Sequence, residues 1–112
     1  MKEITIEESY EFFYDTLKLL DISELDNSDE YVEHIYLEEL DIGTVSFLHS
    51  ETVQRLLRHN LINESIAKES LELREIILTL ISEKREVKQI RFDNSWKQVR
   101  EKAKNILNKK NH

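Results

Sequence analysis

The chain has 112 residues and a formal net charge of -7, with 39% hydrophobic and 35% charged residues. This length suffices for one domain with one hydrophobic core, and the frequent Leu, Ile and aromatic residues exclude wholesale disorder. The sequence has no Cys, no Pro and one Gly, which excludes a disulfide framework and leaves β-hairpins without their usual turn residues. We therefore predict one all-α domain over residues 1–112, a compact bundle of four or five helices.

Targeting signals are also missing from the sequence. No apolar run approaches the roughly 20 residues that a transmembrane helix needs. The start, Met1 to Thr5, is followed by acidic residues and not by the apolar segment of a signal peptide. We expect a cytoplasmic protein that does not enter a membrane.

Two helices are predicted in the acidic first part of the chain. The first covers about residues 6–20 and begins with a capping box, because Thr5 and Glu8 have the spacing for reciprocal side-chain to backbone hydrogen bonds. Asn27 and Glu30 repeat that spacing and predict a second helix that ends near residue 40. Apolar residues recur at helical spacing and form one inward face on each helix: Tyr10, Phe13, Tyr14, Leu17 and Leu20, then Val32, Ile35, Tyr36 and Leu40.

The middle of the chain is predicted to be helical with interruptions. Gly43 is expected to cap the second helix in a left-handed conformation. A short helical turn near residues 45–48 is followed by a longer piece capped by Ser50. A long helix over about residues 64–84 is the strongest candidate for the centre of the core. Its apolar stripe consists of Ile66, Leu73, Ile76, Ile77, Leu80 and Ile81.

The last third of the chain is basic. Residues 85–92 break the helical period and could form either a short strand or a connector, with Val87, Ile90 and Phe92 attached to the core. A basic helix is predicted over about residues 94–108, with Ser95 at capping distance from Gln98. The tail, residues 109–112, is expected to be frayed.

Charge is divided unequally along the chain. Residues 1–50 hold 14 Asp or Glu and 2 Lys or Arg, a net charge of -12, whereas residues 51–112 hold 9 and 14, a net charge of +5. Two arrangements follow from this division. Either the last helix lies across the first two and neutralises them, or an acidic face is offered to a basic partner.

Catalytic motifs are not found. No Ser lies in a Gly-x-Ser-x-Gly elbow, and a single Gly provides no phosphate-binding loop. Glu30, His34 and Glu38 are four residues apart and share one helix face, but one His among carboxylates is more typical of a solvated acidic helix than of a metal site. We expect neither enzymatic activity nor a cofactor or metal.

A nucleic-acid-binding interpretation rests on Gln54 to Leu73. This segment could fold as helix, turn and helix, with Arg55, Arg58 and His59 near the turn. Helix-turn-helix domains usually have a Gly in the turn and a net basic charge. The acidic charge of this chain opposes phosphate binding, so nucleic-acid binding ranks third among the functions considered.

The acidic residues of the second helix are the best candidate for a partner-binding surface. Tyr31 and Tyr36 lie among them, and Tyr is enriched at interface hot spots, so we take both as candidate anchors. The predicted carboxylates are Asp26, Asp29, Glu30, Glu33, Glu38, Glu39 and Asp41.

Two stretches stand out, Asp41–Leu48, which leads into Leu56–Ile62, and Ile90–Lys97 with the helix that follows. In these stretches most strongly, the sequence resembles small bacterial immunity proteins, including those of contact-dependent growth inhibition systems. Such proteins are short, acidic, Cys-free and cytoplasmic, and each neutralises one toxin domain, often a basic nuclease. The resemblance thus implies an inhibitor that occludes a basic cleft with its acidic face.

A regulatory or structural interaction module is the alternative function. Such a module could be a homodimer that buries the remaining apolar side chains, Phe12, Leu19 and Leu37, in a second copy of the chain.

Overall fold

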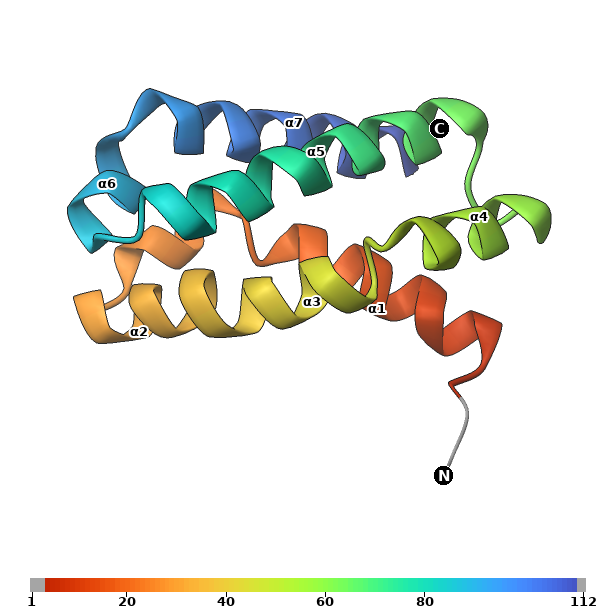
Figure 1. The fold of residues 1–112 in the computed structure, drawn as a ribbon, viewed down its shortest axis with the longest axis horizontal. Coiled ribbons are helices and arrows are strands. Elements are labelled where there is room, and N and C mark those ends of the chain that lie inside the picture. The colour runs from red at the N-terminus through yellow and green to blue at the C-terminus, as the bar shows by residue number, and fades with distance from the viewer. Residues whose placement is uncertain (1–3, 111–112) are drawn as a thin grey trace.

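A computed structural model describes residues 4–110 (Figure 1). Met1–Glu3, considered above for a signal peptide, lie outside the described residues, as do residues 111–112 of the predicted frayed tail. Every regular element over residues 4–110 is helical, which confirms the all-α fold. In Figure 1 the last long helices, α5 and α7, lie side by side above the first half of the chain, and α4 closes one end.

The first helix, α1 (Ile6–Lys18), begins as predicted. The Thr5 hydroxyl accepts from the Glu8 N–H at 3.1 Å, and the Glu8 carboxylate accepts from the Thr5 N–H at 3.2 Å. This capping box satisfies backbone donors that have no partner within the helix. Phe13 and Leu17 then place the apolar face of α1 in the core.

The connection to the second helix is a short 3-10 helix, η1 (Ile22–Asp26). The next helix begins one residue later than predicted, because the hydroxyl of Ser28 and not the amide of Asn27 accepts from the Tyr31 N–H, at 3.3 Å. Asn27 instead closes η1 by donating to the Glu24 carbonyl at 3.0 Å.

The second helix is continuous across three segments, α2 (Asp29–His34), a π-helical turn η2 (Ile35–Glu39) and α3 (Leu40–Ser46). In η2 the Leu40 N–H donates to the carbonyl of Ile35, five residues earlier. Inward residues recur every four positions, a repeat that drifts around a regular helix of 3.6 residues per turn. The wider π turn offsets this drift, so the buried residues keep facing the core: Val32, Tyr36, Leu40 and Thr44.

The predicted end of this helix at Gly43 is wrong. Gly43 does not have a positive φ, and it lies inside α3 against α1. A Cβ atom on Gly43 would lie 2.5 Å from Oγ1 and 2.7 Å from Cγ2 of Thr16. The glycine is therefore explained by the close approach of two helices and not by a left-handed cap.

Two further helices follow, α4 (Ser50–Arg58) and α5 (Glu64–Glu83). The cap of α4 is His49 and not Ser50, since the His49 Nδ1 accepts from the Glu51 N–H at 3.1 Å. The long α5 is central, as predicted, and contacts α3, α4 and α7. All members of its predicted stripe are buried except Ile76, which is half-buried.

The segment left open between strand and connector forms a helix, α6 (Val87–Phe92). Ile90 reaches the core, but Phe92 is exposed, so its predicted attachment to the core is wrong. The last helix, α7 (Asn94–Lys110), is capped by Asp93 and not by Ser95, because the Asp93 carboxylate accepts from the Ser95 N–H at 2.8 Å.

The predicted fraying is wrong for Lys109. The helix α7 includes this residue, and its ammonium group donates to Ser65 at 2.8 Å and to Glu69 at 2.7 Å. Side chains from all the long helices meet in one hydrophobic cluster, whose largest members are Trp96, Tyr14, Tyr36 and Phe13. None of the helices over residues 4–110 has the length and apolar composition to span a membrane.

Replacement of Gly43 by Ala tests the packing of α1 against α3. Ala is favoured over Gly inside a helix by about 0.5–1 kcal/mol, but the added Cβ would overlap Thr16. We expect Gly43→Ala to destabilise the protein by about 1–3 kcal/mol, as other overpacked cores are, measured by urea unfolding.

The double variant Thr16→Ala/Gly43→Ala is the internal control. It removes the two closest atoms, so it should be more stable than the sum of the two single effects predicts. A Gly43→Ala protein that is more stable than the wild type would contradict the packing explanation.

Candidate functional site

The outer side of the continuous helix from α2 to α3 carries most of the predicted site. We call its exposed side chains, together with Asp26 before it, the acidic face. The acidic face consists of Asp26, Asp29, Glu30, Tyr31, Glu33, His34, Glu38, Glu39, Ile42 and Val45. Of the predicted residues, Asp41 is half-buried at its edge. The structure therefore places six of the seven predicted carboxylates on one continuous helix, with Asp26 at the end of η1 just before it.

Tyr36 does not belong to this surface. Its side chain is fully buried, its ring packs edge-on against Trp96 at 5.3 Å, and its hydroxyl accepts from Arg100 at 3.5 Å. Burial raises the pKa of the Tyr36 phenol, while the hydrogen bond and charge of Arg100 oppose this rise. The predicted role of Tyr36 as a partner-binding anchor is wrong, because it lies on the inward side of the π turn.

Tyr31 is on the surface, as predicted, and is 43% exposed. The negative charge of Glu24 raises the pKa of its phenol, with smaller contributions from burial, a hydrogen bond with Glu24 and the charge of Glu39. The ring is therefore a partly exposed apolar group within a region of negative potential.

The sequence interpretation missed two exposed apolar side chains beside the predicted carboxylates. Ile42 is 63% exposed and Val45 is 50% exposed. They continue the line of Glu38 along the outside of the helix, because residues three or four apart share a helix face. Their spacing was readable in the sequence, but the expected helix end at Gly43 separated them from the acidic residues.

His34 joins two of the acidic residues. Its Nδ1 lies 2.6 Å from Glu38 Oε2, and its Nε2 lies 3.2 Å from Glu39 Oε1. A partner four residues away is usual in an α-helix, whereas one five residues away is brought onto the same side by the π turn. Over residues 4–110, no group of three or more His, Asp or Glu side chains converges as a metal site.

The basic last third leaves most of the acidic face uncompensated. Among the salt bridges between described residues, only Arg91 to Asp29, at 2.9 Å, joins residues 1–50 to residues 51–112. Arg91 also donates to the carbonyls of Leu25 and Asn27, so it fixes the start of α2. The helix α7 packs mainly against α5, α1 and α6, and reaches the acidic helix through the contacts of Trp96 and Arg100 with Tyr36 in η2.

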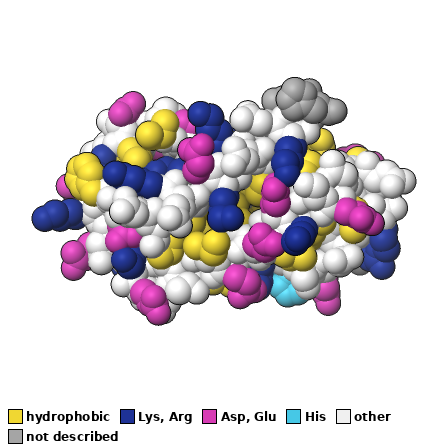
Figure 2. Space-filling view, turned by 90° about the horizontal axis from the view of Figure 1, so that it is seen from above, with side chains coloured by type: hydrophobic (Ala, Val, Ile, Leu, Met, Phe, Trp, Pro, Cys, Tyr) yellow, Lys and Arg dark blue, Asp and Glu magenta, His cyan; other side chains and the backbone are white. Residues whose placement is uncertain are grey.

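Figure 2 shows the molecule from the side of α5 and α7. Lys and Arg side chains alternate there with Asp and Glu, and form no continuous basic patch. The helix α5, which would be the second helix of a helix-turn-helix, carries five Glu and two basic residues. Such a charge pattern does not match the phosphate backbone of a nucleic acid.

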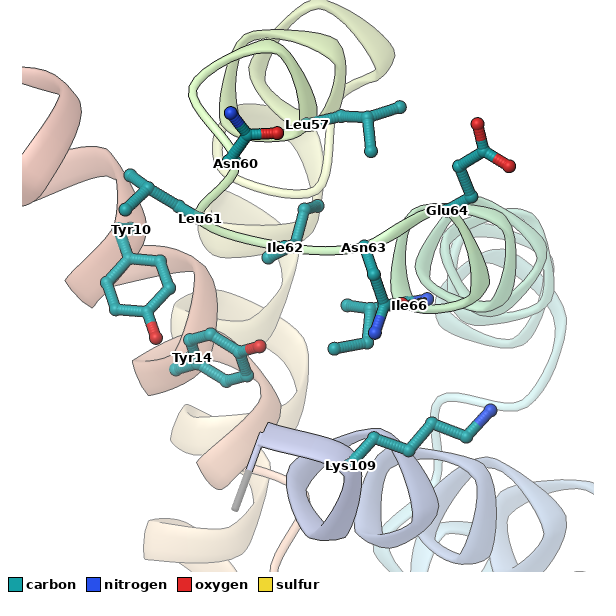
Figure 3. A pocket seen from close by; sticks show the side chains of 10 residues that line it. All are labelled: Tyr10, Tyr14, Leu57, Asn60, Leu61, Ile62, Asn63, Glu64, Ile66 and Lys109. Atoms are coloured by element: carbon teal, nitrogen blue, oxygen red, sulfur yellow. Dashed lines mark hydrogen bonds between the residues drawn. The ribbon is translucent and has the colours of Figure 1, made fainter. Parts of the chain in front are cut away.

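A cavity of about 580 Å³ lies where the α4–α5 turn meets α1 and the end of α7 (Figure 3). Tyr10 and Tyr14 project toward it from α1, and Asn60 and Asn63 border it from the turn. Asn60 has a φ of 60°, a left-handed conformation that Asn tolerates. The cavity combines amide, phenol and apolar groups, and Glu64 is its one carboxylate among the described lining residues.

Comparison of the chain with models of known protein families, with curated proteins and with solved structures finds no match.

The phenol of Tyr14 provides a test of the packing around this cavity. Burial, with a smaller contribution from Tyr10, raises the pKa of Tyr14 from 10.0 to about 12. Because the folded state holds this proton more tightly than the unfolded state, the associated stability is complete below pH 10 and is lost as the pH rises through 12.

We expect Tyr14→Phe to make the alkaline decline in unfolding free energy shallower, by about 1.4 kcal/mol per pH unit within this window. Urea unfolding at several pH values measures how the free energy of unfolding changes with pH in the wild type and in the variant. Equal slopes for the wild type and the variant would show that the Tyr14 proton is not linked to folding.

Proposed function

We propose that this protein is a non-catalytic, cytoplasmic immunity protein that binds a basic toxin domain, such as a nuclease, and occludes its active cleft. The observation that carries the proposal is the acidic face, in which exposed carboxylates and three exposed apolar side chains share one continuous helix. The resemblance to bacterial immunity proteins points to the same role.

Electrostatics favour a basic partner. The half of the chain that contains the acidic face has a net charge of -12, and only Asp29 of its carboxylates is paired with the basic half among the described residues. A field of one sign speeds the encounter with an oppositely charged protein. In the cleft of a nuclease, which attracts phosphates with Lys and Arg, carboxylates could occupy the positions of substrate phosphates.

Apolar contacts would supply the lasting affinity. Stable interfaces have a less polar centre and a charged rim, and truncation of a few buried anchors costs most of the binding energy. Tyr31, Ile42 and Val45 are spaced along the acidic face and are flanked by Glu30, Glu38 and Glu39. This pattern supports an interface in which the three apolar side chains enter pockets of the partner.

The helix that bears these groups is held in place by contacts with the rest of the protein. Its inner side is fixed by Tyr36 and Leu40 in the core, and its start is held by Arg91. A preorganised helix loses little conformational entropy on association. The acidic face therefore differs from the flexible acidic tails that bind basic partners without specificity.

The test compares two variants of equal charge. Glu30→Lys/Glu33→Lys reverses two exposed carboxylates of the acidic face, and Glu72→Lys/Glu83→Lys reverses two exposed carboxylates of α5. Tagged wild type and both variants are used to capture partners from the native host, and the captured partner is assayed for toxicity with and without each protein.

We expect the wild type and the α5 variant to retain one basic partner and to neutralise its toxicity. The acidic-face variant should associate at least about tenfold more slowly at low salt. Equal association of both variants would overturn the acidic face as the binding site, and a partner without toxicity would overturn the immunity role.

Self-association is the second candidate function, and exposed Ile42 and Val45 favour it. The face first considered for a homodimer is less suitable, because Leu19 and Leu37 pack against the core and Phe12 contacts Phe47 at 4.9 Å between ring centroids. A dimer through α3 would bring two acidic faces together, which opposes its formation.

Light scattering coupled to size exclusion separates these candidates. We expect the mass of one chain over a wide range of concentrations, because like charges repel across the α3 face. A concentration-dependent dimer that Ile42→Asp abolishes would instead identify the exposed apolar side chains as a self-association surface.

A further inference from the structure

A second surface is a groove between the end of α1, η1, α6 and α7. It adjoins the start of the acidic face, because Arg91 lines the groove and pairs with Asp29. Its volume is about 650 Å³, within the ~300–1,000 Å³ range of small-molecule sites. Four segments contribute to its walls, so the groove is a concavity and not a flat interface. Its apolar lining is aliphatic: Leu17, Leu20, Ile22, Leu25, Ala103 and Leu107.

The charged groups of the groove are mostly cationic. Arg91, Lys97, Arg100 and Lys104 line it, against two carboxylates, those of Asp21 and Glu101. Lys97 and Lys104 are exposed on α7, and neither takes part in a salt bridge among the described residues. The groove is thus positively charged in a protein whose net charge is -7.

Arg100 is the most unusual of these residues, because its side chain is only 8% exposed and forms no salt bridge within residues 4–110. Its guanidinium donates to the Ile90 carbonyl at 2.8 Å, to the Arg91 carbonyl at 3.4 Å and to the Tyr36 hydroxyl at 3.5 Å. These acceptors are neutral, so Arg100 has no direct ion-pair partner among the described residues; the charges of Asp21 and Glu24 reach the neighbouring Tyr36 hydroxyl from farther away. A buried cation is normally compensated by an anion.

We propose that this groove binds an amphiphilic carboxylate of the fatty-acid type, with the alkyl chain against the accessible Ile22, Leu25 and Leu107 and the carboxylate among Lys97, Arg100 and Lys104. Each half of such a ligand has a complementary surface in the groove. The aliphatic side chains can contact the alkyl chain, and the cations, which outnumber the carboxylates, can bind the head group. The groove is short and enclosed by several segments, so it suits a compact ligand. A helix of a partner protein would need a longer groove.

The negative charge of the ligand would be compensated in two ways. Lys97 and Lys104 provide exposed ammonium groups that can follow the head group, and Arg100 adds a fixed positive charge at the wall. The carboxylate of Asp21 caps η1, because one of its oxygens accepts a hydrogen bond from the Ser23 N–H at 2.8 Å. This hydrogen bond, and to a smaller extent the charge of Lys104, lower the pKa of Asp21, so Asp21 and Glu101 are both negative charges that compete with the ligand.

The binding test uses dodecanoate below its micelle concentration, titrated calorimetrically into the full chain. Dodecyltrimethylammonium, which has the same alkyl length and the opposite charge, is the ligand control. We expect saturable one-to-one binding of dodecanoate and much weaker binding of the cation. Equal binding of the two amphiphiles, or binding without saturation, would overturn the proposal.

Two charge variants locate the site. Lys97→Glu/Lys104→Glu changes the groove, and Lys88→Glu/Lys102→Glu makes the same change in net charge at exposed positions outside the groove lining. The groove variant should weaken dodecanoate binding about tenfold, since two favourable charges become repulsive. The control variant should change it less than about twofold; equal effects of both variants would overturn the site.

A synthetic acidic amphipathic peptide serves as the competing occupant. Its binding to the wild type and not to the groove variant, without binding of dodecanoate, would replace the fatty-acid proposal with a peptide-docking groove. The acidic-face variant Glu30→Lys/Glu33→Lys should bind dodecanoate like the wild type. The two surfaces are therefore tested independently of each other.

Discussion

The contact of Trp96 with Tyr36 joins the two halves of this chain. Both rings are fully buried and meet edge-on, an arrangement that aromatic pairs favour. The polar atoms of the pair are also satisfied, since the Trp96 indole donates to the Lys84 carbonyl at 3.0 Å and Arg100 donates to the Tyr36 hydroxyl. One junction thereby connects α7, the α5–α6 corner and the π turn of the acidic helix.

This junction determines where the charges of the molecule lie. With Tyr36 held inward, the carboxylates on either side of it in sequence project outward, and η2 sets their phase relative to α3. Among the basic residues of the C-terminal third, only Arg91 forms a salt bridge with these carboxylates in the described part of the chain, to Asp29, because α7 is held against α5 and α1. Negative charge on the acidic face and positive charge in the groove therefore lie on two adjoining surfaces that meet at the Arg91–Asp29 pair.

The two surfaces suit partners of different kinds. The acidic face is long and convex, and its apolar side chains stand among carboxylates, which is the composition of a protein interface. The groove is short and concave, and its aliphatic walls lie beneath cations, which is the composition of a small-molecule site. The charge of each surface opposes the ligand of the other, so the two kinds of ligand are not expected to exchange sites.

Local sequence rules predicted much of this fold, but not all of its details. The all-α class, the capping box of α1 and the buried stripe of α5 follow from spacing and propensity, which act within a few residues. The carboxylates of the acidic face were also readable, because charged residues at helical spacing opposite an apolar stripe lie outside. The inward position of Tyr36 was also predicted from spacing, but its additional assignment as a surface anchor was wrong, because its ring packs against Trp96, sixty residues away.

The sequence by itself thus determined that this protein is an acidic helical domain with one core and a charged outer helix face. Only the tertiary structure decided that Gly43 continues the helix, since that depends on how closely Thr16 approaches it. The exposure of Ile42 and Val45 followed from that continuation. The cationic groove likewise combines α1, η1, α6 and α7, and contacts between such distant segments are set by packing and not by local spacing.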